Sequence, residues 1–182
     1  MVDGLRKLHS SLPSFCQAYS DKLQDTVSKC EREALLSEKS PFLVVIEKTY
    51  GENSAVQWLM MQLSAFNEYC GKKEKMDDWQ IENLARNIVN RYGWLKASEI
   101  LLFLNRYKNG ELGPMYGTVD PQDFMVVFIE RFLPWRGMMI DKYEREAKRE
   151  SERKQQRVTL KPEQIKALRE RLDDTSNKLK TN

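Results

Sequence analysis

The sequence has little histidine and little cysteine, and these two shortages exclude several kinds of functional site. His9 is the only histidine among 182 residues. A metal site built from several histidines and a histidine-activated nucleophile are therefore excluded for nearly all of the chain. The three cysteines, Cys16, Cys30 and Cys70, are odd in number and show no Cys-x-x-Cys spacing, which argues against a disulfide framework and a zinc site. We therefore expect no metal, no cofactor and a reducing, cytoplasmic setting.

Long apolar runs are also missing from the chain. The longest unbroken run, from Phe124 to Ile129, is far shorter than the roughly 20 residues that cross a bilayer. The first residues, MVDGLRKLHSSL, contain no continuous apolar segment of the kind that a secretory signal requires. The sequence predicts neither a membrane span nor a signal peptide.

Charge of one sign is not in large excess, since the formal net charge is +3. Its distribution is uneven, however. From Asp141 to Asn182 there are 13 Lys and Arg against 9 Asp and Glu, a net charge of +4. The preceding 140 residues hold 17 against 18, a net charge of −1. The body is therefore no polycation, and the basic excess belongs to the C-terminal tail.

What the sequence does contain is a helical pattern. Apolar residues recur at spacings of three and four, which is typical of amphipathic helices. One such series predicts a single helix from Leu12 to Ala34. Ser40 before Pro41, and Asp120 before Pro121, each predict an N-cap followed by proline at the first helical position.

The segment from Phe42 to Ile46 has enough β-branched residues to pass for a buried strand. No second strand candidate exists to pair with it, so we predict a short helix that ends at Gly51. Further helices are predicted to end near Gly71, Gly93 and Gly110. Residues 1–143 thus predict an all-α domain, a compact bundle of about five or six helices.

The C-terminal part is predicted to differ from this bundle. Pro134 and Gly137 predict a kink or a brief break, because proline has no N–H to donate. Residues 144–157 have no apolar face and are expected to form a charged helix that projects into solvent.

Residues 158–182 are predicted to form a short amphipathic helix and a flexible tail. Ile165, Leu168 and Leu172 lie at i, i+3 and i+7, the pattern by which a short helix docks into an apolar groove. The groove can belong to a partner or to the chain's own body, and both alternatives are open.

A loop rich in glycine joins two of the predicted helices. Gly110, Gly113 and Gly117 can adopt positive φ without steric cost, so the loop is expected to have a defined shape. It lacks the Lys-Ser/Thr ending of a phosphate-binding P-loop and follows a helix rather than a strand. A structured connector and a ligand-binding loop are the two interpretations.

Lysines and aromatic residues are mixed in and around the loop after Cys70. Single-stranded nucleic acid is bound by such mixtures through phosphate contacts and base stacking. The candidate residues are Lys72, Lys73, Lys75, Tyr107, Lys108 and Tyr116. The alternative is that the rings belong to the core and the lysines are only solvated.

Three ordered motifs resemble one protein family. LSAFNEYCGKKEKM (residues 63–76), YGWLKASE (92–99) and NGELGPMYGTVDP (109–121) resemble an uncharacterised all-helical family of anaerobic gut bacteria, their phages and their mobile elements. The family pattern includes a Ser-Glu pair like Ser98-Glu99, and the chain departs from the pattern at Pro114-Met115. The resemblance covers about residues 41–145. The family has no established activity, so the resemblance implies a genomic setting and, by analogy, an adaptor role.

These observations predict a non-enzymatic, nucleic-acid-associated adaptor, such as a replication accessory protein of a phage or mobile element. Its partner would be single-stranded nucleic acid or a replication protein. The alternative is a protein–protein interaction or assembly protein that uses the C-terminal helix as an arm. No catalytic residues are predicted, since no pair of carboxylates stands in an apolar setting and Glu99 is expected on the polar face of its helix.

Overall fold

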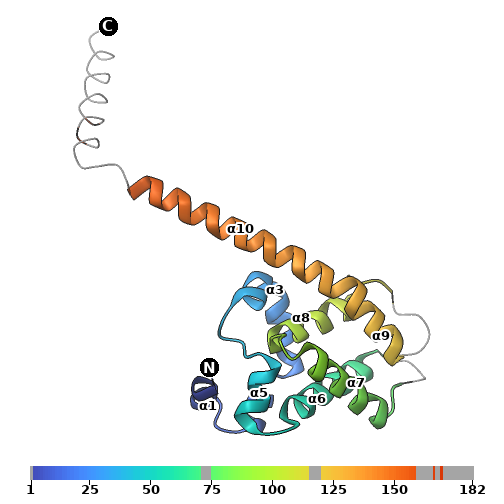
Figure 1. Ribbon diagram of the computed structural model, residues 1–182. Helices are drawn as coiled ribbons and strands as arrows, with labels where there is room; N and C mark the ends of the chain where they lie inside the picture. Colours follow the sequence, from blue (N-terminus) through green and yellow to red (C-terminus); the bar gives the residue numbers. More distant parts are fainter. Residues whose placement is uncertain (1, 71–74, 115–119, 159–165, 167–168, 170–182) are drawn as a thin grey trace. The chain divides into compact units, whose positions relative to one another are not determined.

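The structure is a computed structural model that describes residues 2–70, 75–114, 120–158, 166 and 169 (Figure 1). This described part is helical and contains no strand, which confirms the predicted all-α class, with more helices than predicted. The elements are α1 (Val2–Leu8), α2 (Leu12–Ala18), the 3-10 helix η1 (Asp21–Leu23), α3 (Gln24–Lys29), α4 (Glu31–Leu36), α5 (Leu43–Tyr50), α6 (Ser54–Tyr69), α7 (Asp78–Tyr92), α8 (Ala97–Lys108), α9 (Pro121–Val127), the π-helix η2 (Phe128–Phe132) and α10 (Leu133–Val158). Within the described ranges, no helix has the length and apolar character that a membrane span needs.

The chain divides into two compact units, Met1–Ile140 and Asp141–Asn182. The boundary between them falls within α10, so the first turns of this helix belong to the first unit.

Helix α8 is the central element of the first unit. Every residue from Ala97 to Asn105 is buried, as expected of a helix that other elements surround. Helix α8 packs against α3, α4 and α6, while α6 also packs against α5 and α7, and α7 packs against α9 (Figure 1). The Phe103 ring lies 5.2, 5.0 and 5.1 Å from the rings of Phe124, Phe128 and Phe132. These aromatic contacts fix α9 and η2 against α8.

The segment after Ser40 forms the predicted short helix, but not with the predicted cap. Helix α5 has Phe42 as its N-cap and ends at Gly51, whose φ of 105° requires glycine. The Ser40 hydroxyl instead accepts a hydrogen bond from the Ser98 N–H at 2.9 Å. Ser40 therefore connects this segment to α8 rather than beginning α5.

The single helix predicted from Leu12 to Ala34 is wrong, because the stretch is divided into α2, η1, α3 and α4. Helix α2 ends at Tyr19, whose carbonyl accepts hydrogen bonds from Trp58 Nε1 at 2.8 Å and from Gln62 Nε2 at 3.1 Å. Both donors belong to α6. Tertiary hydrogen bonds thus override a regular apolar period.

The break predicted near Pro134 takes a different form. Helix α9 passes into the π-helix η2, in which the Leu133 N–H bonds to the Phe128 carbonyl, and α10 continues through Pro134 and Gly137. In a π-helix each N–H bonds to the carbonyl five residues earlier, so the hydrogen-bond partners change in the turn just before Pro134. Pro134 itself has no N–H to donate.

Candidate binding site

Several of the predicted binding residues lie outside the described residues. They are Lys72, Lys73 and Tyr116 of the predicted nucleic-acid site, and Ile165, Leu168 and Leu172 of the predicted docking helix.

Tyr107 lies in the core rather than on a binding surface. Its side chain is 5% exposed, and its ring stacks on Phe66 with a centroid distance of 5.4 Å. Phe103 and Phe124 contact the same ring. A ring enclosed in this way cannot stack on a base, so Tyr107 does not belong to a nucleic-acid interface.

The two remaining lysines both contact the last turn of α6. Lys108 Nζ lies 5.1 Å from the centroid of the Tyr69 ring, and Tyr69 is 60% exposed. Lys75 Nζ lies 2.6 Å from a carboxylate oxygen of Glu68. Burial lowers the pKa of Lys108, and the charge of Asp21 opposes that shift. We call Tyr69, Lys75 and Lys108 the basic cluster.

The described part of the glycine loop has the predicted backbone. Gly110 has a φ of 74° and Gly113 a φ of 103°. A Cβ atom on Gly113 would overlap with the Arg131 guanidinium, which donates a hydrogen bond to the Leu112 carbonyl. Gly113 therefore lets Arg131 hold the loop against η2, as a structured connector requires.

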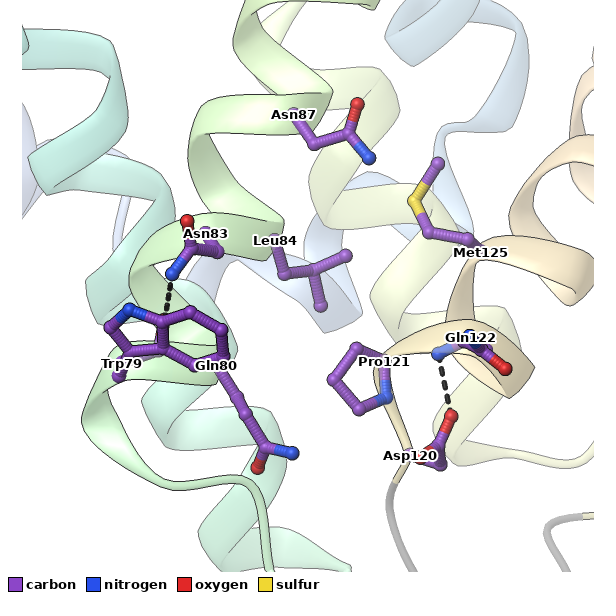
Figure 2. A pocket seen from close by; sticks show the side chains of 9 residues that line it. All are labelled: Trp79, Gln80, Asn83, Leu84, Asn87, Asp120, Pro121, Gln122 and Met125. Carbon is purple, nitrogen blue, oxygen red and sulfur yellow. Dashed lines mark hydrogen bonds between the residues drawn. The ribbon is translucent and has the colours of Figure 1, made fainter.

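A pocket of about 590 Å³ lies between α7 and α9 (Figure 2). Pockets for small ligands commonly have volumes of this order. Figure 2 shows Trp79 and Leu84 on the α7 side and Pro121 and Met125 on the α9 side. The other lining residues are Gln80, Asn83, Asn87, Asp120 and Gln122. Four of these five carry a carboxamide, so the lining combines apolar surface with neutral hydrogen-bonding groups.

Both helices that form the pocket begin at an N-cap, and Asp120 of α9 is the predicted one. Asp77 and Gln80 form a capping box at the start of α7, with hydrogen bonds of 2.8 and 2.9 Å. Asp120 accepts the Gln122 N–H at 2.6 Å, and Pro121 occupies the first position of α9. These caps fix the backbone at the rim of the pocket.

The surroundings of the pocket are acidic. Asp120 is the charged residue of its lining. The N-cap and first turn of α7 and the first turn of α9 add further carboxylates, whereas the nearby cations Lys75 and Arg86 are paired with Glu68 and Glu82. The added carboxylates are Asp77, Asp78 and Asp123.

The sequence contains a signal for this pocket outside the motifs described above. Trp79, Asn83 and Asn87 lie at four-residue intervals, beside the apolar face that Leu84 and Ile88 help to form. An indole that lies off the apolar face of a helix is exposed, and Trp79 is 72% exposed.

Glu99 is fully buried and does not lie on a polar helix face as predicted. Its carboxylate lies 2.8 Å from Arg136 Nη2 and accepts the Lys96 N–H at 2.9 Å. Burial raises the pKa of Glu99, although the Arg136 charge opposes the shift. The pair joins α8 to the first turn of α10, and its oxygens are occupied by these contacts. Its geometry suits a structural role rather than acid–base chemistry.

Ser98, the other member of the Ser-Glu pair, also makes structural contacts. Its hydroxyl donates to the Ala34 carbonyl at 2.7 Å, and Lys96 Nζ donates to the Leu35 carbonyl at 2.9 Å. These bonds tie α8 to α4. No group of His, Cys, Asp and Glu in the described part of the chain is arranged to hold a metal ion.

Comparison with known proteins gives one family. Residues 75–179, more than half of the chain, match DUF6633, a family of unknown function. The matched region includes the pocket between α7 and α9 and the Glu99–Arg136 pair. No curated protein and no solved structure matches the chain. The chain therefore belongs to the DUF6633 family of unknown function.

Proposed function

We propose that this protein is a non-enzymatic adaptor that associates with single-stranded nucleic acid, such as a replication accessory protein of a phage or mobile element. The observation that carries the proposal is the basic cluster at the end of α6, where Lys108 lies beside the exposed Tyr69 ring and Lys75 contacts the neighbouring Glu68. The replication setting rests on the resemblance of the sequence motifs to a family of phages and mobile elements.

Lys108 is suited to contact a phosphate. Among the described residues, no carboxylate lies within ion-pair distance of its ammonium group. Lys108 is partly buried, which removes part of the water around that group and lowers its pKa. A phosphate oxygen would supply a charge-assisted hydrogen bond in place of the lost water.

Tyr69 supplies the stacking surface that Tyr107 cannot. Its ring is 60% exposed and lies beside the Lys108 ammonium. Stacking of a base on an aromatic side chain contributes about 1–3 kcal/mol. A ring and a cation side by side can therefore hold a base and its phosphate together.

Fluorescence anisotropy with a labelled single-stranded oligonucleotide tests this proposal. We expect binding at low salt and a decrease in affinity as salt rises, with a log–log slope of roughly −0.7 per phosphate contact. Lys108→Gln should reduce the magnitude of that slope by about 0.7, because one phosphate contact is lost. Tyr69→Ala should weaken binding by about tenfold with the slope unchanged.

Lys48→Gln is the matched control, since Lys48 is an exposed lysine on α5. This variant should bind as the wild type does. The proposal is rejected if no oligonucleotide binds at low salt, or if Lys48→Gln and Lys108→Gln weaken binding equally.

A second candidate function is assembly through the C-terminal helix as an arm. The observation that favours it is that α10 remains helical to Val158, although the side chains from Glu144 to Gln155 are almost all exposed. Ion pairs within the helix, such as Glu150–Lys154 at 2.9 Å, support a helix that buries no face. Such a helix can connect a folded unit to a docking segment.

A further inference from the structure

The pocket between α7 and α9 presents a row of carboxamides next to an exposed indole. Trp79, Asn83 and Asn87 follow one another on α7. Four residues of helix correspond to about 6 Å along the axis. In Figure 2 the three side chains come from α7, next to the residues of α9 that close the pocket. Among the described residues, the Asn87 side chain has no hydrogen-bond partner.

This spacing matches that of an extended peptide. A β-strand advances about 6.6 Å per two residues, so alternate peptide groups of a strand would meet successive turns of α7. One carboxamide offers both an N–H donor and a C=O acceptor, the two groups that a peptide unit needs. Asn83 uses one N–H to bond the Trp79 carbonyl at 2.8 Å and keeps its other N–H and its oxygen. Asn83 and Asn87 can therefore each bind the backbone of a strand.

The indole and the acidic surroundings select the side chains of that strand. A lysine or arginine can lay its aliphatic stem on the Trp79 ring and direct its cation toward carboxylates. Asp120 lies in the lining, and three more carboxylates, Asp77, Asp78 and Asp123, lie at the starts of α7 and α9. The same charge disfavours a phosphate-containing ligand.

We propose that this pocket binds an extended, lysine- or arginine-containing peptide segment of a partner protein. The inference is independent of the proposed association with nucleic acid, because it concerns different residues and a ligand of opposite charge. A chain with both properties would connect a basic protein segment to nucleic acid.

The test uses a fluorescein-labelled heptapeptide in which lysine and alanine alternate. In an extended conformation its lysines share one face, and its peptide groups remain free for the carboxamides. We expect the peptide to bind, and Asn87→Ala to weaken binding by about 3- to 10-fold through the loss of hydrogen bonds. Trp79→Ala should weaken binding by about tenfold or more, as the loss of an aromatic anchor does.

Asn90→Ala is the matched control, because Asn90 is an exposed asparagine of α7 that lines a different pocket. The affinity of the Asn90→Ala protein for the basic heptapeptide should equal that of the wild type at the same ionic strength. A heptapeptide with glutamate in place of lysine should not bind. Both substituted pocket residues are exposed, so melting curves should show that all variants fold as the wild type does.

Three results would overturn the proposal. The first is that the basic peptide does not bind. The second is that it binds the Asn87→Ala, Trp79→Ala and Asn90→Ala proteins equally, which would indicate unspecific attraction between charges. The third result is displacement of the peptide by cellohexaose with a dependence on Trp79, which would assign the pocket to a neutral carbohydrate.

Discussion

Glu99 and Arg136 form an ion pair whose two members should respond differently to substitution. Glu99 is fully buried, whereas the Arg136 side chain is 17% exposed and lies 4.8 Å from the centroid of the Trp94 ring. Arg136→Met removes the ion-pair partner of a buried carboxylate, so we expect a loss of about 3–5 kcal/mol in the free energy of unfolding. Glu99→Gln keeps an acceptor for the Lys96 N–H and leaves a cation that water reaches, so its loss should be smaller. Urea denaturation at pH 7 measures both losses.

The pH dependence of stability tests the same residue. Burial raises the pKa of Glu99, so the folded protein holds this proton more tightly than the unfolded chain does. The stabilising contribution of the protonated carboxyl is complete below the ordinary pKa of glutamate, and it is lost as the pH rises through the raised pKa. The unfolding free energy of the wild type should therefore fall relative to that of Glu99→Gln across this window. A change in the opposite direction would mean that the Arg136 charge outweighs burial.

At the scale of secondary structure, the sequence predicted those elements whose signals are local. The cap Asp120 and the terminating Gly51 act within a few residues of themselves, so the start of α9 and the end of α5 were predicted. The division of the N-terminal stretch was not predictable in this way. The Tyr19 carbonyl is bonded by donors 39 and 43 residues further along the chain, and an apolar period carries no information about them.

The Trp58 indole should stabilise the chain turn at the end of α2 in two ways, by its hydrogen bond to Tyr19 and by the core volume that it fills. Trp58 is fully buried, and its Nε1 donates to the Tyr19 carbonyl at 2.8 Å. Trp58→Phe removes the donor and part of the ring, so we expect a loss of about 2–4 kcal/mol in the free energy of unfolding. Urea denaturation measures the loss, with Trp79→Phe at an exposed position as the control. If Trp58→Phe were as stable as that control, Gln62 alone would satisfy the Tyr19 carbonyl.

At the scale of the whole molecule, the candidate sites depend on which distant segments meet. Tyr107 was a candidate for base stacking because lysines and aromatic residues are mixed around it, with a core position as the alternative, and the fold encloses its ring among Phe66, Phe103 and Phe124. The pocket needs α7 and α9 to pack together, and no pattern within one helix predicts that contact. The exposed side of α7 with Trp79 could have been identified from helical periodicity alone.

The C-terminal segment allows a test of the assembly alternative on the full chain. Ile165, Leu168 and Leu172 are its predicted anchors, and a helix of about eleven residues is marginal in water without a groove to bind it. If the groove belongs to a partner, deletion of residues 158–182 should leave the melting temperature nearly unchanged and abolish recovery of that partner in pull-downs. Deletion of residues 173–182 keeps the three anchors and should preserve recovery. A fall of more than about 4 °C for the longer deletion alone would instead mean that the anchors pack on the chain's own body, since about 1 kcal/mol shifts Tm by roughly 2–4 °C in chains of this size.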